Sequence, residues 1–384
     1  MDTIRLFYED PHLKTFSATV VTCQQAGQYW AVTLSQTAFY PEGGGEVCDT
    51  GFLGDARVLD VQEQDDTIIH TCDRPLAAGS TVRGGIDWAR RFDQMQQHTG
   101  EHIVSGIIFR TYGFHNSGYH VGSDGMEVDF DGVISPEDIP FIEQKANEAV
   151  WANLPVRCWF PAEDVLPTLS YRTKRPLPWP VRIVDIQGAD SCACCGIHVK
   201  HTGEVGLIKI SSCAKLRGGV RLVIRCGQRA LQHIHQVYEQ NRLVSQAFSA
   251  QMLQTGEAAQ KMNEALAAEK LRASALQKEV FFHTAQQYKG SETAVHFQEG
   301  LPPQQLRELA DAIANAVSGW AAVFSPGDTG TGYCLASRDA DLRELNKALT
   351  AALHGRGGGK PNFQQGSLSA TRDEIEAFFA QRQA

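Results

Sequence analysis

A long stretch without proline, residues 228–282, divides this chain of 384 residues. Its composition shifts to Ala, Gln, Glu, Lys and Leu, which favour helices, so the stretch is predicted to be one long helix or a helical hairpin. A chain of this length is also too long for one ordinary core. We therefore expect a multidomain α+β protein with four parts: residues 1–86, 87–227, 228–285 and 290–384.

Apolar residues within the helical part suggest a packing seam. They do not form a strict heptad repeat, so the pattern does not specify a regular coiled coil. A spacer between domains and a helical hairpin or coiled coil that joins two copies of the chain remain equally compatible with it. The seam residues are Leu231, Ile234, Tyr238, Met262, Leu266, Ala273 and Leu276.

The other three parts carry different patterns. Residues 1–86 hold short β-rich runs separated by Gly, Asp and Pro, which predicts a small β-barrel or sandwich. Residues 87–227 begin with Asp87 as the N-cap of a predicted helix and continue with strands and at least one more helix, which predicts a mixed α+β domain. Residues 290–384 alternate strand-like and helix-like runs, which predicts a compact α/β module.

The charge and the first residues limit the function classes. A formal net charge of -9 argues against unspecific nucleic-acid binding over the whole surface, because such binding neutralises many phosphates. Nucleic-acid binding by a local basic face is still compatible with this charge, since residues 205–238 contain no acidic residue and residues 169–184 form a second basic run. The opening MDTIRLFYED is charged where a signal peptide is apolar, and no run is long enough to span a membrane, so we expect a cytoplasmic protein.

Two pairs of side chains have metal-binding chemistry and the same spacing. His98 and His102 lie four residues apart on the predicted helix, and therefore on one face of it. Cys194 and His198 are also four residues apart, in the run CACCGIH that follows a predicted strand. Together these four residues form a candidate tetrahedral zinc site.

The sequence excludes one class of metal site but does not decide between a catalytic and a structural zinc. A thermolysin-like protease needs glutamate directly after the first histidine, and Thr99 stands there, so this class is excluded. A closed zinc site that only stabilises the fold stays open, because the sequence does not show whether a coordination position is free. The neighbours Cys192 and Cys195 also leave open which sulfur binds the metal.

Several motifs together resemble one family. The runs TAFYPEGGGEVCDTG, HTGEHIVSG and CCGIHVKHTGEVGLIKI resemble the editing domain of alanyl-tRNA synthetase and its freestanding relatives, the AlaX editing proteins. The run GRGGGKP resembles the C-terminal domain of the same synthetase, a module shared with the DHH phosphoesterase superfamily. The order and extent of the motifs resemble the long form of AlaX. The chain departs from the family pattern at Glu46, where glutamine is usual, and at Cys195 and Ile197, which replace a glycine and a threonine.

The resemblance implies a trans-editing hydrolase that cleaves the aminoacyl ester of Ser-tRNA(Ala), with Gly-tRNA(Ala) as a second candidate substrate. It implies a Zn2+ cofactor held by the four residues above. It also implies that Thr37 contacts the serine hydroxyl and that the backbone of Gly43, Gly44 and Gly45 approaches the aminoacylated adenosine. No catalytic side chain is assigned beyond the zinc ligands. Glu101 is a candidate general base, although a helical glutamate usually faces solvent.

The implied partner is tRNA(Ala), and two basic features are expected to contact it. One is the strand pair near residue 217, and the other is a glycine-rich loop after a predicted helix, where backbone amides and cations can meet phosphates. The residues are Lys215, Arg217, Arg221, Arg356, Gly357, Gly358, Gly359 and Lys360.

Two other functions remain as alternatives. A non-catalytic tRNA-binding protein stabilised by zinc fits the same motifs. A DHH-type phosphoesterase fits less well, because the chain lacks the aspartate-rich motif of that class.

Overall fold

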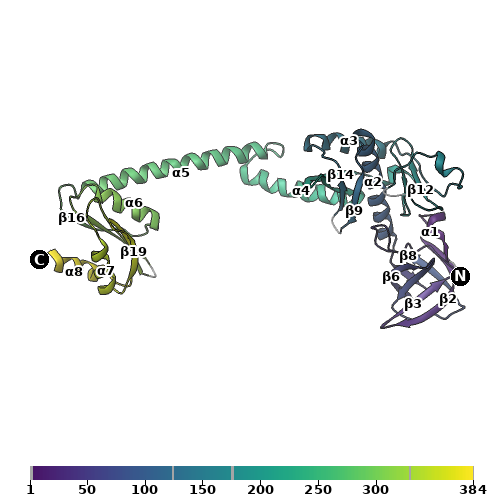
Figure 1. Ribbon diagram of the computed structural model, residues 1–384, viewed down its shortest axis with the longest axis horizontal. Helices are drawn as coiled ribbons and strands as arrows, with labels where there is room; N and C mark the ends of the chain where they lie inside the picture. The colour runs from purple at the N-terminus through teal and green to yellow at the C-terminus, as the bar shows by residue number, and fades with distance from the viewer. Residues whose placement is uncertain (1–2, 123–124, 174–176, 328–329, 384) are drawn as a thin grey trace. The chain divides into compact units, whose positions relative to one another are not determined.

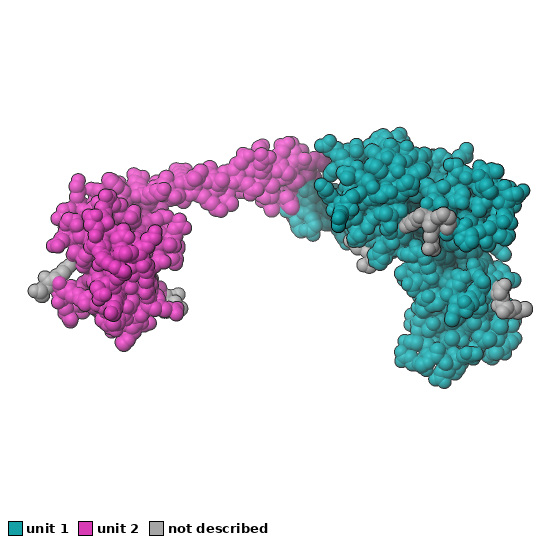
Figure 2. Space-filling view, in the orientation of Figure 1, with its two compact units in different colours: residues 1–243 teal, residues 244–384 magenta. Residues whose placement is uncertain are grey.

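The computed structural model describes residues 3–122, 125–173, 177–327 and 330–383. The chain divides into two compact units, residues 1–243 and 244–384 (Figure 2). The described residues combine helices with several sheets, which confirms the α+β class (Figure 1). The finer division of the chain into four parts stays a prediction. None of the described helices is long and apolar enough to cross a membrane.

Six strands near the N-terminus close into a barrel, in the order β2-β3-β7-β6-β5-β8. Their side chains alternate between the barrel interior and the surface, as in β2, where Phe16, Ala18 and Val20 are buried and the residues between them are exposed. The strands are β2 (Thr15–Ala26), β3 (Tyr29–Leu34), β5 (Gly51–Leu53), β6 (Ala56–Gln64), β7 (Thr67–Cys72) and β8 (Thr81–Ile86). Outside the barrel lie β1 (Ile4–Arg5), its parallel partner β4 (Gln36–Thr37) and the short helix α1 (Leu6–Glu9).

A polar network joins the barrel strand β7 to β4 through His70 and Thr37, both fully buried. The His70 Nδ1 lies 3.1 Å from the carbonyl oxygen of Val32, so Nδ1 donates and Nε2 accepts from the Thr37 hydroxyl at 2.8 Å. The Thr37 hydroxyl oxygen in turn accepts from the backbone N–H of Phe39 at 3.1 Å. Every polar atom of the pair is satisfied when His70 is neutral.

The helix α2 (Trp88–Tyr112) is the one that the sequence predicts after Asp87. The Asp87 carboxylate accepts a hydrogen bond from the backbone N–H of Arg90, and Gly113 ends the helix at φ +76°. Two glycines inside the helix are explained by close packing. A Cβ atom at Gly100 would lie 2.2 Å from Cys226 Sγ, and one at Gly106 would lie 2.1 Å from the carbonyl oxygen of Ala189.

Two sheets and a helix surround α2. An antiparallel sheet has the order β14-β15-β10-β9, and a three-stranded sheet has the order β11-β12-β13. The strands are β9 (Asn116–Val121), β10 (Met126–Phe130), β11 (Val156–Trp159), β12 (Ile183–Ile186), β13 (Asp190–Ala193), β14 (Ile208–Leu216) and β15 (Gly219–Cys226). The helix is α3 (Ile139–Trp151), and single helical turns lie at Pro136–Asp138, Leu166–Thr168 and Thr202–Val205. One core cluster joins α2, α3 and these sheets.

The proline-free segment is helical, as predicted, and consists of α4 (Gly227–Phe248) and α5 (Thr255–Gln286). The predicted seam is largely open to solvent, since Leu231, Tyr238 and Leu266 are 49%, 56% and 52% exposed. The structure therefore shows no partner for this seam among the described residues of the chain.

The second unit holds a five-stranded sheet with the order β16-β17-β18-β20-β19. Neighbouring residues of β17 face opposite sides: Val323 packs in the core cluster with α6, and Phe324 packs in the one with α7 and α8. Helices thus cover both faces of the sheet. The strands are β16 (Thr293–Phe297), β17 (Trp320–Gly327), β18 (Gly330–Ser337), β19 (Arg356–Lys360) and β20 (Phe363–Leu368), and the helices are α6 (Pro303–Ala314), α7 (Arg343–Ala352) and α8 (Arg372–Gln383).

The sequence predicted a loop for the glycine-rich run near residue 358, and this prediction is wrong. The run forms the edge strand β19. Two of its glycines are needed for its place at the edge of the sheet. A Cβ atom at Gly357 would lie 2.1 Å from the Tyr333 hydroxyl, and one at Gly359 would lie 2.2 Å from the carbonyl oxygen of Phe363. The run resembles a flexible turn in the sequence, but it pairs with β20 as an edge strand. Glycine is required at these two positions because a side chain would collide with the paired strands.

Protonation of His70 should destabilise the barrel in mildly acidic solution. Burial lowers the pKa of His70 to about 4, whereas an unfolded histidine keeps a pKa of about 6.5. The unfolded chain therefore takes up the proton first, so this stability is full above about pH 6.5 and is lost as the pH falls towards about 4. We expect His70 to account for a loss of about 2 kcal/mol in unfolding free energy between pH 8 and pH 5.

Urea unfolding of the full chain over this pH range measures the effect. His70→Gln should lack this part of the pH dependence, whatever its stability at pH 8. An equal pH dependence in both proteins would show that His70 is not buried in its neutral form.

Candidate metal centre and its cavity

The four predicted metal ligands come together in the structure. His98 and His102 project from α2, and Cys194 and His198 lie in the loop after β13. Their ligand atoms all lie within 4.8 Å of one another. A set of three imidazoles and one thiolate suits zinc, and the cluster can hold one metal ion.

Two of the three histidines make a hydrogen bond through Nδ1, since His102 Nδ1 lies 2.9 Å from Asp190 Oδ2 and His198 Nδ1 lies 3.2 Å from Thr99 Oγ1. His98 Nδ1 lies 2.8 Å from a Glu46 oxygen, an ion-pair distance without the geometry of a hydrogen bond. Metal-ligating histidines are typically oriented in this way by a carboxylate or another polar group. The Nε2 atom of His98 lies 3.5 Å from Cys194 Sγ.

His198 provides a direct test of whether the cluster fits a metal. Its Nε2 is buried and has no hydrogen-bond partner among the residues that the structure describes. An unpartnered buried nitrogen is costly, and a metal ion at the centre of the cluster would satisfy it. The residues present therefore fit a bound metal.

Cys194 is the sulfur that lies with the three histidines, whereas Cys192 lies in a second group with His102 and Asp190. Burial alone would raise the pKa of Cys194, but the neighbouring His98 and His102 outweigh it and lower this pKa to about 5. Cys194 is therefore poised as the thiolate, which is the form that binds metals. Burial raises the pKa of Cys192 to about 12, and the pKa of Cys195 is raised by burial as well.

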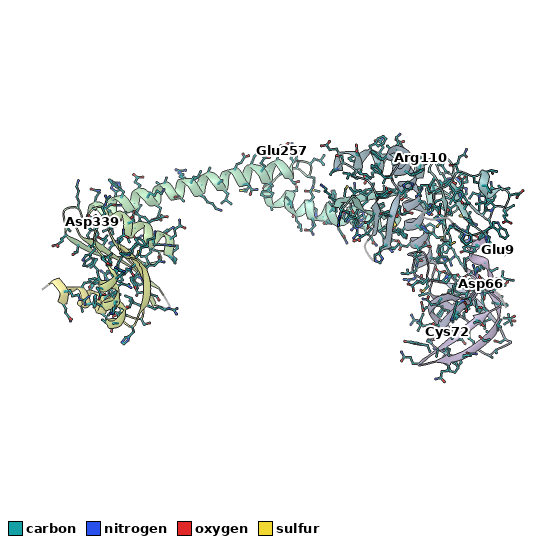
Figure 3. The ribbon with its side chains drawn as sticks, in the orientation of Figure 1. Glu9, Asp66, Cys72, Arg110, Glu257 and Asp339 are labelled. Atoms are coloured by element: carbon teal, nitrogen blue, oxygen red, sulfur yellow. The ribbon has the colours of Figure 1, made fainter. Side chains whose placement is uncertain are left out.

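Arginines from the basic run 169–184 shape this centre instead of facing solvent. Arg172 makes a bidentate contact with Asp190, with both distances 2.7 Å, and so fixes the carboxylate that orients His102. Arg182 donates to the carbonyl oxygens of Cys194 (3.0 Å) and Gly196 (2.7 Å). Arg110 of α2, labelled in Figure 3, donates to the carbonyl oxygen of Ala189 just before β13.

Gly43–Glu46 form a tight turn that places the Glu46 side chain beside His98. Gly43 and Glu46 exchange two backbone hydrogen bonds of 3.1 and 3.0 Å, and Gly44 and Gly45 have φ of +64° and +94°. Glu46 is 3% exposed and reaches His98. Gly196 leaves room for this contact, because a Cβ atom there would lie 2.5 Å from the Glu46 carboxylate.

A cavity of about 740 Å³ opens beside the cluster, a size that suits a small ligand or the end of a larger one. Its wall includes His98, His102 and Cys194, which a ligand can therefore approach. The other lining residues include Tyr40, Gly44, Glu46, Glu101, Asn116, Tyr119, Arg172 and Leu177.

Glu101 does not face solvent, contrary to the sequence expectation. It is 5% exposed and lines the cavity, with one oxygen 4.0 Å from His102 Nε2. Its other oxygen accepts hydrogen bonds from Ser105 Oγ and Asn116 Nδ2, each 2.5 Å long. Burial raises its pKa, but His102, Arg172 and the Ser105 hydrogen bond outweigh this, so the net pKa is lowered and the carboxylate is ionised.

Of the other predicted substrate-binding residues, Gly44 lines this cavity, whereas Gly43 and Gly45 are not among its described lining residues. Thr37 is absent from its described lining, and its hydroxyl is bonded to His70 of the barrel strand β7. The Arg221 guanidinium, 40% exposed, contacts Glu127 at 2.6 Å and Asp129 at 2.7 Å. Lys215 and Arg217 are exposed near the turn of the β14–β15 hairpin. In the second unit Arg356 and Lys360 are exposed at the two ends of β19.

Comparisons with known proteins match both the barrel and the metal centre. The family model "Threonyl and Alanyl tRNA synthetase second additional domain" matches residues 181–223, which include Cys194 and His198. The model "tRNA synthetases class II (A)" matches residues 11–90. An alanine–tRNA ligase of Thermofilum pendens is 32% identical over 96% of this chain, and the chain spans only 42% of that ligase.

Two freestanding proteins match over most of their own length. The alanyl-tRNA editing protein Aarsd1-B of Xenopus laevis is 29% identical, over 90% of this chain and 86% of that protein. The alanyl-tRNA editing protein Aarsd1 of Mus musculus is 27% identical, over 97% of this chain and 96% of that protein. This chain is a homologue of alanyl-tRNA editing proteins and of alanine–tRNA ligases.

Removal of the Glu46 carboxylate should weaken metal binding. Glu46→Ala removes the carboxylate that lies 2.8 Å from His98 Nδ1, so we expect the affinity for Zn2+ to fall about 10–100-fold, measured by competition with a chelator. Glu46→Gln keeps an acceptor oxygen and should lose less. Glu42→Ala, at an exposed position in the same loop, is the matched control and should bind Zn2+ like the wild type. Unchanged affinity in a folded Glu46→Ala protein would contradict the role of this carboxylate.

Proposed function

We propose that the chain is a zinc-dependent deacylase that hydrolyses the aminoacyl ester of Ser-tRNA(Ala) in trans, with Gly-tRNA(Ala) as a second substrate. The observation that carries the proposal is the metal-type cluster in the wall of a cavity that also holds two buried carboxylates, Glu46 and Glu101. Both full-length relatives named above carry names of alanyl-tRNA editing proteins, which supports the same substrate class.

The cavity is suited to the aminoacyl end of a tRNA. The α-ammonium group of an aminoacyl ester is positive, and the carboxylates of Glu46 and Glu101 make the cavity attractive to it. The turn at Gly44 presents backbone without a side chain at the cavity wall, where a ribose and base can approach. His98, His102, Cys194 and His198 would hold the zinc ion, which when bound would polarise the ester or lower the pKa of a water towards about 7.

Glu101 is the side chain placed to move the proton. Its carboxylate is ionised, lines the cavity and lies 4.0 Å from His102 Nε2. An ionised carboxylate at this place can take the proton of the attacking water and pass it to the leaving ribose oxygen. Ser105 and Asn116 hold one of its oxygens, which leaves the other free for this role.

Binding of the tRNA body is a separate part of the proposal. Lys215 and Arg217 would contact phosphates near the metal-binding unit, and the cations Arg356 and Lys360 with the glycine strand between them would contact RNA in the second unit. Arg221, which was predicted with them, would have to exchange its contacts with Glu127 and Asp129 for phosphate. The exposed apolar residues of α4 and α5 support a homodimer through the helical segment as a further proposal.

In a second candidate function the same cluster binds a metal but catalyses no reaction. In that case the metal only stabilises the fold of a tRNA-binding protein. The position of the cluster in a cavity wall, beside an ionised buried glutamate, favours the enzyme over this alternative.

Deacylation assays separate the two functions. Wild-type protein should release serine from Ser-tRNA(Ala) and spare Ala-tRNA(Ala) and Ser-tRNA(Thr). Glu101→Gln keeps the shape of the side chain and all metal ligands, so we expect kcat to fall about 10²–10⁴-fold with zinc content and tRNA affinity unchanged. Cys194→Ala should lose both zinc and activity.

Glu148→Gln, at an exposed position on α3, serves as the control and should be fully active. Release of serine from none of the three substrates by wild-type protein would contradict the enzyme and leave the tRNA-binding protein. Full activity of Glu101→Gln would exclude Glu101 as the general base.

A further inference from the structure

The cavity beside the metal cluster has a buried floor and an exposed rim. On the floor, Glu101 and His102 are only 5% and 3% exposed. At the rim, the side chains of His115 and Asp131 are 55% and 51% exposed, and both line the cavity. A ligand that extends from the floor to solvent can therefore contact these two side chains where it leaves the cavity.

His115 and Asp131 are fastened to each other. The backbone N–H of His115 donates to Asp131 Oδ1 at 2.6 Å, and the backbone N–H of Asp131 donates to the His115 carbonyl oxygen at 3.1 Å. Between the side chains, His115 Nδ1 lies 3.4 Å from Asp131 Oδ2. The pair thus joins the residue just before β9 to the residue just after β10, so the rim is held by the sheet at this point.

These contacts leave one end of the His115 imidazole available to a ligand. The ring packs beside the ring of Phe109, with 5.0 Å between the two centroids. Because Nδ1 is beside Asp131, Nε2 stands on the far side of the ring. This Nε2 has no hydrogen-bond partner among the residues that the structure describes.

The place of the pair relative to the cluster indicates which part of a ligand it meets. His115 directly precedes Asn116, whose Nδ2 donates to Glu101 at 2.5 Å, and Glu101 lies 4.0 Å from His102 Nε2. The pair therefore lies next to the residues that flank the cluster. In an aminoacyl ester held at the cluster, the next group outward is the ribose that carries the ester.

The chemistry of the pair suits a ribose hydroxyl. A hydroxyl both donates and accepts hydrogen bonds, so it can bond to Nε2 in either tautomer of the imidazole. A phosphate group suits this place less well, because the Asp131 carboxylate beside the ring would repel it. A hydroxyl contact here would distinguish a ribose from a deoxyribose.

We propose that His115 recognises the terminal ribose of the substrate through a hydrogen bond between its Nε2 and the hydroxyl beside the aminoacyl ester. Asp131 is the positioning residue that holds the imidazole. This inference rests on the proposed function, because it assumes that an aminoacyl ester enters the cavity. It makes the site specific for esters on a ribonucleotide.

The test compares the binding of two non-hydrolysable probes, adenosine with a 3′-amide-linked seryl group and its 2′-fluoro counterpart. Fluorine keeps the ring shape of a ribose, but it cannot donate a hydrogen bond and accepts one only weakly. Wild-type protein should bind the hydroxyl probe about tenfold more tightly than the fluoro probe. His115→Phe keeps an aromatic ring without nitrogen atoms and should bind the two probes equally.

His120→Phe is the matched control, because His120 is an exposed histidine of β9 that is not among the described lining residues. It should keep the wild-type preference. Asp131→Ala releases the imidazole and should reduce the preference, whereas Asp131→Asn keeps an oxygen for the His115 N–H and should retain most of it. Zinc content and thermal unfolding show whether each variant is folded, and His115→Ala replaces His115→Phe if that variant does not fold.

Three results would overturn the inference: equal binding of the two probes by the wild type, a preserved preference in His115→Phe, or loss of the preference in His120→Phe as well. An unchanged preference in Asp131→Ala would overturn the positioning role of that carboxylate.

Deacylation of Ser-tRNA(Ala) is measured in parallel to keep the two proposals apart. Active wild type with a preserved preference in His115→Phe would reject the inference and keep the enzyme. Inactive wild type whose preference for the hydroxyl probe depends on His115 would reject the enzyme and keep the ribose site.

Discussion

The ion pair between Arg91 and Asp49, both fully buried, is the contact on which the rest of the site depends. Arg91 lies on α2 two turns before His98, and Asp49 lies three residues after Glu46. Arg91 also donates to the carbonyl oxygens of Pro11 and Ala38, so the pair fastens the barrel to the helix. Loss of one partner would leave a buried charge, which typically costs about 3–5 kcal/mol. This constraint holds the Glu46 turn against the histidine that it orients.

Much of the site is local in the sequence, and that part was predictable. The Asp87 cap, the helix α2 and the four-residue spacings of both ligand pairs depend only on nearby residues. The groups that hold the histidines were not predictable in the same way. The Asp190 contact with His102 and the Thr99 contact with His198 each join residues about ninety to a hundred positions apart, and they form only when separate elements pack. Glu46 stood out in the sequence only as a departure from the family pattern.

The contacts of individual polar side chains were not predictable from the sequence. Thr37, Arg221 and Glu101 were assigned by type and position, but a polar side chain is used by whatever partner tertiary packing brings to it. Packing pairs Thr37 with His70, Arg221 with two carboxylates, and Glu101 with a serine and an asparagine. Likewise, the glycines near residue 358 looked flexible in the sequence but form an edge strand. Glycine stands at positions 357 and 359 because a side chain there would collide with neighbouring atoms of the sheet.

We propose that the metal cluster and the cavity form one reactive site. This is tested by the absorption spectrum of the Co2+-substituted protein, titrated with a non-hydrolysable adenosine probe that carries a 3′-amide-linked seryl group. We expect bands of a four-coordinate site with a thiolate ligand, which are absent in Cys194→Ala and shift as the probe binds. A spectrum that stays unchanged while the probe is shown to bind would mean that the metal does not meet the ligand and that the cluster and the cavity are not one site.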